Sequence, residues 1–239
     1  MPPSRIACVA VPALPLQLLL QRAPDWRPHP TVVVKDDRPQ GVILWANARA
    51  RSQRILPGMT FAAARSLAND LRAAVVEPHA IEEAVSRLHL QLGDYSPRVE
   101  PSSTEPGVLW LDPNGMTPLY GSLEQWAHTL AASLRAAGWI AHVVVGFHRY
   151  RTYALARTRK GVQRPWVLHD PHIESRQAAK TPLQNLGIAP RLRDQLMVLG
   201  VHTLGAFLRL PAAELPTRFG PEAARLHARA SDPWTPMQP

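Results

Sequence analysis

The side chains in this sequence best suited to binding a ligand are its arginines. The chain has 27 basic residues, and all of them except Lys35, Lys160 and Lys180 are arginines. A guanidinium group is a planar fork that binds phosphate through two parallel hydrogen bonds. With 18 acidic residues, the chain carries a formal net charge of +9, which favours a nucleic acid as the partner.

Many of the arginines lie in two segments that contain no acid, one between Asp37 and Asp70 and one between Glu124 and Asp170. A surface of one sign concentrates phosphate ligands and speeds their encounter. The alternative is a compositional bias that places arginine on an ordinary solvated surface, and the 25 prolines agree with such a bias. The basic residues are Arg38, Arg49, Arg51, Arg54 and Arg65 in the first segment, and Arg135, Arg149, Arg151, Arg157, Arg159, Lys160 and Arg164 in the second.

Other kinds of reactive site find little support. His169 and His172 flank Asp170, but Pro171 and the lack of further ligands argue against zinc. The single cysteine, Cys8, excludes a disulfide framework and lies in an apolar segment, which indicates a buried residue rather than a nucleophile. The sequence has neither a phosphate-binding G-x-x-x-x-G-K loop nor a serine-hydrolase elbow.

A chain of 239 residues with 46% hydrophobic side chains can bury the core of one large domain or two small ones. Its first apolar run is broken by Pro12 and Pro15, and no apolar stretch reaches about 18 residues. We therefore expect no secretory signal and no membrane span. A cytoplasmic protein, associated with the nucleoid if it binds DNA, is the expectation.

Apolar periodicity predicts alternating strands and helices up to residue 168 and only short helices after residue 182. This order is typical of an α+β sheet domain followed by a small helical domain. In the helical part, Gly187 and Gly200 mark turns whose backbone N–H groups could hold a DNA phosphate. The predicted strands are 5–11, 31–34, 42–45, 108–111, 141–145 and 166–168, and the predicted helices are 14–22, 47–54, 60–71, 80–93, 119–137 and 150–159.

Several motifs in this order resemble the Y-family, or translesion, DNA polymerases over essentially the whole chain. Ala46–Arg51 followed by Pro57-Gly58-Met59 is similar to the fingers motif A-N-Y-x-A-R, and Val145-Gly146-Phe147 is similar to the V-G-I-S strand. Residues 183–209 resemble the thumb with its helix-hairpin-helix, and residues 230–236 resemble the G-x-D-x-x-P junction before the little-finger domain. The resemblance implies a palm at 1–11 and 76–165, fingers at 12–75, a thumb at 166–230, and at 231–239 the start of a linker to a missing little-finger domain.

Within that family, the sequence most resembles the ImuB-type homologues of bacterial mutagenesis cassettes, which are regarded as polymerase-like proteins that do not polymerise. Three stretches carry this resemblance, namely residues 12–18 (PALPLQL), 37–41 (DRPQG) and 219–223 (FGPEA).

The resemblance also shows which catalytic positions differ. Two-metal phosphoryl transfer needs carboxylates converging on two Mg²⁺ ions, which an active Y-family palm takes from an Asp on its first strand and an S-x-D-E motif. Ala10 stands where that first Asp would be. In the second motif Glu105 matches one of the pair, while the other position falls on Thr104 or Pro106. We therefore expect no metal, no cofactor and no polymerase activity.

The nucleotide pocket implied by the resemblance is also reduced. Ala48 replaces the tyrosine that contacts the triphosphate, and the aromatic position that senses the sugar falls on Leu14 or Pro15. Arg51 alone is retained, either as a remnant of nucleotide binding or as an exposed helix arginine.

The resulting prediction is a non-catalytic scaffold that holds DNA and partner proteins during damage-induced mutagenic translesion synthesis. The partners implied by the resemblance are a RecA-like ImuA-type accessory protein, an error-prone replicative-type polymerase and the sliding clamp. One alternative is an active translesion polymerase with relocated ligands such as Glu105 and Asp112. Another is a protein-interaction platform without DNA affinity, whose basic stretches would be balanced by nearby acids. The predicted DNA-binding residues are Arg149, Arg151, Arg157, Arg159, Lys160, Gly187, Arg191, Arg193 and Gly200.

Overall fold

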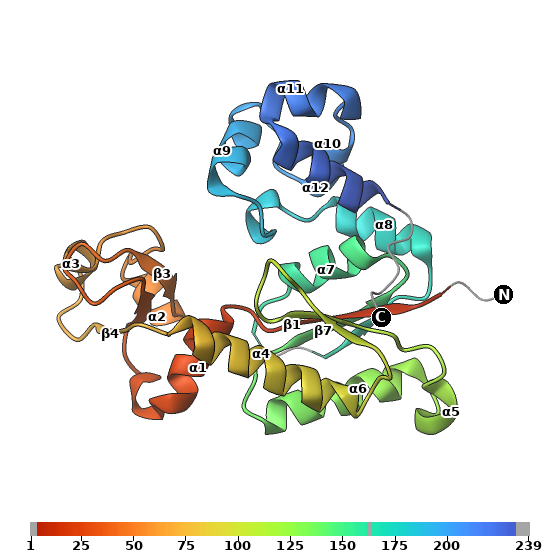
Figure 1. The fold of residues 1–239 in the computed structure, drawn as a ribbon, viewed down its shortest axis with the longest axis horizontal. Coiled ribbons are helices and arrows are strands. Elements are labelled where there is room, and N and C mark those ends of the chain that lie inside the picture. Colours follow the sequence, from red (N-terminus) through yellow and green to blue (C-terminus); the bar gives the residue numbers. More distant parts are fainter. Residues whose placement is uncertain (1–3, 162–163, 233–239) are drawn as a thin grey trace. The chain divides into compact units, whose positions relative to one another are not determined.

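The computed structural model of the chain describes residues 4–161 and 164–232, and the chain divides into two compact units (Figure 1). The smaller unit is Ala13–Leu88, and the larger one combines Met1–Pro12 with His89–Pro239. Among the described residues, no helix is both long enough and apolar enough to span a bilayer.

The smaller unit is built on a three-stranded sheet in the order β3-β2-β4, in which β2 is antiparallel to β3 and parallel to β4. Its core contains Val32, Val34, Ile43 and Ile55, all at most 1% exposed. The elements are α1 (Leu14–Arg22), η1 (Pro24–Trp26), β2 (Thr31–Val34), β3 (Ile43–Ala46), α2 (Ala48–Ser52), α3 (Phe61–Arg65), β4 (Arg72–Ala74) and α4 (Pro78–Gly93), whose last five residues belong to the larger unit.

One polar side chain joins three parts of the smaller unit. Asn47 precedes α2, and its side-chain oxygen accepts from the N–H groups of Ala50 (2.8 Å) and Thr31 (3.1 Å). Its amide nitrogen donates to the carbonyl of His29 at 2.8 Å. Asparagine is a preferred residue at this position because it satisfies N–H groups that the first helical turn leaves without a partner.

The larger unit contains a five-stranded sheet in the order β5-β6-β1-β7-β8. The central strand β1 pairs antiparallel with both β6 and β7, while β8 is parallel to β7. Since every residue of β1 is buried, an uninterrupted apolar sequence fits this central position. The strands are β1 (Ile6–Ala10), β5 (Val99–Pro101), β6 (Val108–Leu111), β7 (His142–Gly146) and β8 (Trp166–Val167).

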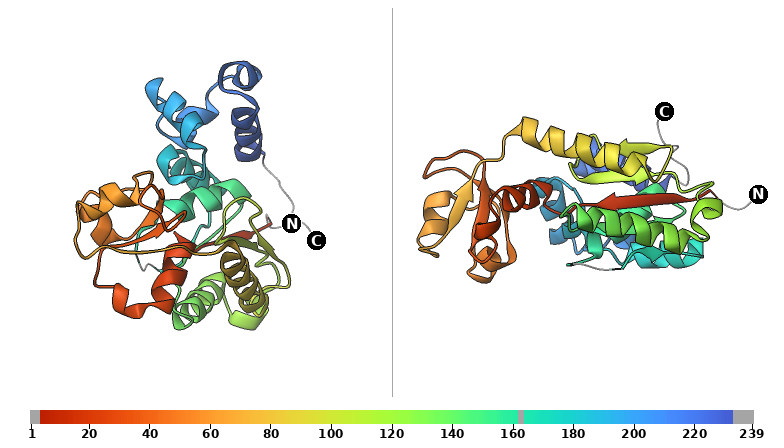
Figure 2. Two further views of the ribbon diagram at one scale, coloured as in Figure 1. Left: turned by 60° about the vertical axis from the view of Figure 1, so that its left-hand side comes forward. Right: turned by 90° about the horizontal axis from the view of Figure 1, so that it is seen from below.

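Helices cover both faces of this sheet, with α7 (Arg149–Thr158) on one face and α6 (Leu123–Ala136) on the other (Figures 1 and 2). Cys8 and Ala10, two residues apart on β1, belong to the core cluster that also contains Tyr153 of α7. This spacing is that of side chains on one face of a strand. The side chains at positions 8 and 10 therefore lie on the face of the sheet that α7 covers.

The rest of the larger unit is helical, and residues 171–231 are called the helical tail below. Leu192, Leu196, Phe207 and Leu226 of the tail are each at most 4% exposed and belong to the same core cluster as Cys8 and Tyr153. The elements are α8 (Pro171–Ala179), η2 (Leu183–Asn185), α9 (Pro190–Val198), α10 (Leu204–Leu208), η3 (Ala212–Glu214), α11 (Leu215–Phe219) and α12 (Pro221–Ser231), and α5 (Thr117–Tyr120) precedes α6.

The structure has the predicted α+β content, and several boundaries differ from the prediction. The helix expected at 119–137 is divided, because Ser122 adopts an extended backbone and its side chain accepts from Gln125 N–H to begin α6. The helices expected at 47–54 and 60–71 are only five residues long. β4 and β5 were not predicted, and β8 extends the sheet past residue 165, where the palm was expected to end. The linker expected at 231–239 lies outside the described residues from 233 onwards.

Candidate functional site

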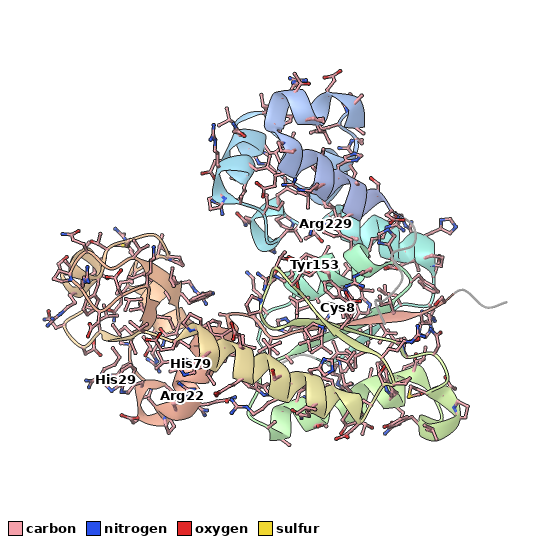
Figure 3. All side chains as sticks on the ribbon, in the orientation of Figure 1. Cys8, Arg22, His29, His79, Tyr153 and Arg229 are labelled. Atoms are coloured by element: carbon pink, nitrogen blue, oxygen red, sulfur yellow. The ribbon has the colours of Figure 1, made fainter. Side chains whose placement is uncertain are left out.

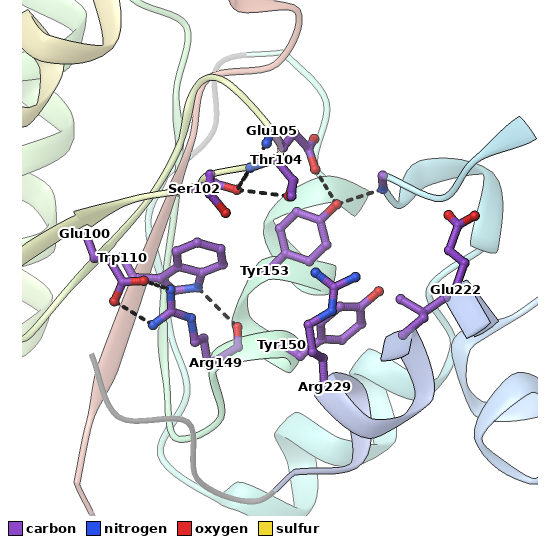
Figure 4. Close-up of a pocket in the computed structure, with 13 residues that line it drawn as sticks. Glu100, Ser102, Thr104, Glu105, Trp110, Arg149, Tyr150, Tyr153, Glu222 and Arg229 are labelled. Carbon is purple, nitrogen blue, oxygen red and sulfur yellow. Dashed lines mark hydrogen bonds and ion pairs between the residues drawn. The ribbon is translucent and has the colours of Figure 1, made fainter. Parts of the chain in front are cut away.

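A cleft of about 420 Å³ opens in the larger unit between the turn that joins β5 to β6, helix α7 and helix α12 (Figure 4). It contains Thr104 and Glu105, the positions that the resemblance assigns to the second metal-binding motif. Side chains with hydroxyl groups, aromatic rings and positive charges also line the cleft, among them Ser102, Trp110, Tyr150, Tyr153, Arg149 and Arg229.

Both carboxylate oxygens of Glu105 are occupied. The Ser102 hydroxyl accepts from the N–H of Glu105 at 3.1 Å and so holds the turn in place. Tyr153 donates its hydroxyl hydrogen to Oε2 of Glu105 at 2.5 Å, and Nη1 of Arg157 lies 3.2 Å from Oε1. Burial, followed by the nearby Glu105 carboxylate, raises the pKa of Tyr153. The phenol therefore stays protonated and acts as a donor.

The same residues reach the helical tail. The N–H of Gly187 donates to the Tyr153 hydroxyl at 2.8 Å, and Nε of Arg157 donates to the carbonyl of Asn185 at 3.0 Å. A Cβ at position 187 would lie 2.7 Å from Oε2 of Glu105, so a larger residue there would displace the Glu105 carboxylate. Glu105, Tyr153, Arg157 and Gly187 are called the Glu105 cluster below, and they link the β5–β6 turn, α7 and the tail.

A second ion pair occupies the other end of the cleft. Arg149 binds both oxygens of Glu100 through its two terminal nitrogens, one of them at 2.8 Å. Its guanidinium carbon lies 4.0 Å from the ring centroid of Trp110, and the Trp110 indole N–H donates to the carbonyl of Arg149 at 3.3 Å. Glu100 and Arg149 are only 20% and 15% exposed, so their charges compensate each other away from bulk water.

These residues do not fit a pair of Mg²⁺ ions. Ala10 ends β1, is 1% exposed and offers only a methyl group. The carboxylates of Glu100 and Glu105 already bind arginines, whereas a metal pair needs several free oxygens at one point. Within residues 4–161 and 164–232, no group of three or more His, Cys, Asp or Glu side chains could hold a metal ion. Cys8 lies beneath this region (Figure 3), where burial raises the pKa of its thiol and keeps it neutral.

The basic segment predicted to contact DNA is largely neutralised or packed. Arg149 and Arg157 form the two ion pairs above. The expectation of a purely positive surface is therefore wrong at these two positions. Arg159 lies 5.6 Å from the ring centroid of Trp166, and burial lowers its pKa. Arg151 is half-buried and Lys160 is exposed. The acids that compensate this segment come from before it in the chain, which is why its sequence looked purely basic.

In the tail, both amides assigned to phosphate binding have internal acceptors. Gly187 N–H donates to Tyr153 and Gly200 N–H donates to the carbonyl of Met197 at 3.0 Å. Arg193 pairs with its neighbour Asp194 at 3.0 Å, whereas Arg191 is exposed on α9. DNA contacts of these residues remain a prediction, which must rest on side chains and not on the two amides.

The remnant of the nucleotide pocket, Arg51, is exposed in α2 of the smaller unit. Its neighbour Ala50 is fully buried in the core of that unit. Because Ala50 packs into the core, the next residue, Arg51, faces solvent. An exposed position agrees with both roles predicted for Arg51, a remnant of nucleotide binding and an ordinary exposed arginine.

Two buried polar residues that the sequence analysis did not identify shape the start of α7. Glu174 is fully buried and accepts from the N–H groups of Phe147 (2.9 Å) and His148 (3.1 Å), so it compensates the positive end of the helix. His148 accepts from the N–H of Tyr150 at 3.2 Å through Nδ1. Burial, followed by the nearby positive charge of Arg151, lowers the pKa of His148 to about 4, so the ring is neutral near pH 7.

A signal for part of the Glu105 cluster is present in the sequence. Tyr153 and Arg157 are four residues apart in a predicted helix and so lie on one face. Their acidic partner could not be identified from this spacing, because it comes from a turn 48 residues before Tyr153.

Comparison with known proteins agrees with this fold. The sequence model of the impB/mucB/samB family matches residues 11–151. DNA polymerase IV of Pelotomaculum thermopropionicum is 28% identical over 225 residues, covering 90% of this chain and 54% of that protein. Protein ImuB of Caulobacter vibrioides is 28% identical over 166 residues, covering 70% of this chain and 35% of that protein. The chain thus spans about half the length, or less, of these curated relatives.

Solved structures are similar over nearly the whole chain. The crystal structure of DinB from Sulfolobus solfataricus superposes with a TM-score of 0.75 at 18% identity, covering 98% of this chain and 69% of that one. The insertion ternary complex of Dbh DNA polymerase gives a TM-score of 0.74 at 18% identity, covering 97% and 68%. The α+β fold is that of Y-family DNA polymerases, and the chain belongs to the impB/mucB/samB family.

Proposed function

We propose that this chain is a non-catalytic, ImuB-type member of its family, which binds DNA during damage-induced mutagenic translesion synthesis. A different polymerase would then supply the chemistry. One observation carries the proposal: the carboxylate of Glu105, which would have to bind metal, is bound by Arg157 and Tyr153. The loss of a carboxylate at Ala10 supports the same conclusion.

DNA binding in this proposal is supported by charge and by resemblance. The net charge of +9 favours a polyanionic partner. The fold is shared with a polymerase described as an insertion ternary complex. Binding is expected to be independent of sequence, because contacts to phosphates carry no information about bases.

The finer assignments complete the proposal. In it, the palm comprises 1–11 and 76–165, the fingers 12–75 and the thumb 166–230. A RecA-like ImuA-type protein, an error-prone replicative-type polymerase and the sliding clamp are the proposed protein partners. The proposed location is the cytoplasm, at the nucleoid.

A primer-extension assay separates this proposal from an active polymerase with relocated ligands. The purified chain is incubated with primed template and all four nucleotides, in Mg²⁺ or in Mn²⁺, beside the Glu105→Gln variant. No extension by either protein is expected. Templated extension that Glu105→Gln abolishes would refute the proposal and favour the alternative in which Glu105 and Asp112 bind the metals. Contamination is excluded by the same variant, since extension by a copurified enzyme would not respond to it.

A further inference from the structure

Three exposed basic side chains surround a hollow where α8 meets α10 in the helical tail. Arg176 lies in the last turn of α8, and Lys180 and Arg209 are the residues that follow α8 and α10. The hollow has a volume of about 650 Å³, and Ala179 and Gly205 contribute to its lining. Arg176 and Lys180 are four residues apart, which places them on one face at the end of α8.

A close backbone contact brings these elements together. A Cβ on Gly205 would lie 2.8 Å from the Cβ of Ala179 and 2.9 Å from its carbonyl oxygen, so α10 can approach α8 only because residue 205 is glycine. The N–H of Leu204 donates to the carbonyl of Thr181 at 2.9 Å and fixes the same junction. The cations therefore project from a framework that is formed before any ligand arrives, which lowers the entropic cost of binding.

Arg176, Lys180 and Arg209 are not paired with acidic side chains of the described residues. Within the part of the chain that the structure describes, the side chains of Arg176, Lys180 and Arg209 have no ion pair or hydrogen bond. The nearest preceding acid, Glu174, is fully buried and binds the N–H groups at the start of α7. From there to residue 213, the sequence contains only one other acid, Asp194, which pairs with Arg193.

We propose that the α8–α10 hollow, defined by Arg176, Lys180, Arg209, Ala179 and Gly205, binds phosphates of a nucleic-acid backbone. Two guanidinium forks and one ammonium group match the charge and geometry of phosphate oxygens. An acidic peptide is a poorer match, because peptide binding draws on large apolar anchors in fitted pockets, while this hollow is open and has an alanine and a glycine in its lining.

This inference deepens the proposed DNA binding and rests on it, but it assigns the contact to a different place. The hollow shares no lining residue with the cleft around Glu105. It also differs from the predicted contacts at Arg149 and Arg157, whose charges are compensated by glutamates.

The test is a titration of fluorescent DNA with the full chain, read as anisotropy at several salt concentrations between about 50 and 200 mM. The probes are a duplex and a single strand of about 20 nucleotides and, separately, a glutamate-rich peptide. The site variant is Arg176→Ala/Lys180→Ala/Arg209→Ala. The matched control, Arg87→Ala/Arg98→Ala/Arg135→Ala, removes the same charge from exposed positions elsewhere.

The site variant should bind DNA at least about tenfold more weakly than the control at low salt. The slope of log K against log salt concentration should also be less negative for the site variant, by about two to three. The reason is that each phosphate contact contributes nearly −1 to that slope. Equal weakening in both variants, or loss of peptide binding with DNA binding unchanged, would overturn the inference. If the wild-type chain binds no DNA at low salt, the proposed function fails as well. Unchanged melting temperatures would exclude unfolding as the cause.

Discussion

Nη1 of Arg157 lies 3.2 Å from Oε1 of Glu105, and the Tyr153 hydroxyl lies 2.5 Å from the other oxygen of the same carboxylate. A guanidinium group and a phenol thus bind the acid that the resemblance assigns to the metal-binding motif. Both donors come from α7, and both also reach the helical tail through Asn185 and Gly187. Charge compensation and packing of the tail therefore depend on the same two side chains.

The first prediction concerns the stability that this contact provides. Arg157→Gln should lower the free energy of unfolding by about 1 to 3 kcal/mol, because it leaves a carboxylate that is only 23% exposed without its cation. In a double-mutant cycle with Glu105→Gln, the coupling should be about 1 kcal/mol or more. Urea unfolding measures both quantities. The control, Arg218→Gln, breaks an exposed pair with Glu214 and should cost at most about 0.5 kcal/mol. Equal costs for the two arginines would contradict the prediction.

Restoring the missing acid on β1 should harm the protein. Ala10→Asp places a carboxylate at a position that is 1% exposed, which should cost about 3 kcal/mol or more. Ala10→Asn has nearly the same volume without the charge and should cost less. Thermal unfolding with EDTA and with Mg²⁺ tests this, and Mg²⁺ should not restore the stability of the Asp variant. A melting temperature above that of the wild type in EDTA, or recovery in Mg²⁺, would show that a metal site survives.

Stability should depend on pH through His148. Burial lowers its pKa from 6.5 to about 4 in the folded protein, so between these values the unfolded chain binds a proton that the folded chain does not. The resulting stability is fully present above about pH 6.5 and is lost as the pH falls towards 4, to a total of about 3 kcal/mol. His148→Asn keeps a side chain that can begin α7 and should flatten the curve over this range. Melting curves recorded from pH 4.5 to 7.5 provide the comparison, with His172→Asn as the control that removes an exposed imidazole elsewhere.

Salt should weaken DNA binding steeply. If the chain engages about four to six phosphates on a duplex, log K should fall against log salt with a slope of roughly −4 to −5. Arg191→Ala, at an exposed position on α9, should reduce the slope by about one, while Arg193→Ala should have a smaller effect because Asp194 already compensates its charge. Anisotropy titrations measure the slopes, and binding indifferent to salt would contradict the phosphate contacts altogether.

Elements with a strong local pattern could be predicted from the sequence, and pairings between distant elements could not. Helix 14–22 and strand 108–111 have the predicted bounds, because their apolar residues recur over whole elements. β4 and β5 contain three residues each, with arginine in one and glutamate and proline in the other. Neither segment has a sequence pattern that predicts a strand. Each becomes a strand because it pairs with a neighbour, β4 with β2 and β5 with β6. In the site, the residue types at Ala10 and Glu105 could be interpreted directly. Glu100 and Arg149 are 49 residues apart and meet only because the fold brings β5 and the start of α7 together.

The position of β1 at the centre of its sheet has a consequence for folding during synthesis. β1 leaves the ribosome well before its two partners, which are β6, at residues 108–111, and β7, at residues 142–146. The intervening smaller unit has a core of its own and can condense while β1 still has two unpaired edges. An apolar strand with free edges is prone to pair with other chains. Nascent chains that stop before β7 should therefore aggregate, and folding of the larger unit should be slow and limited by this long-range pairing.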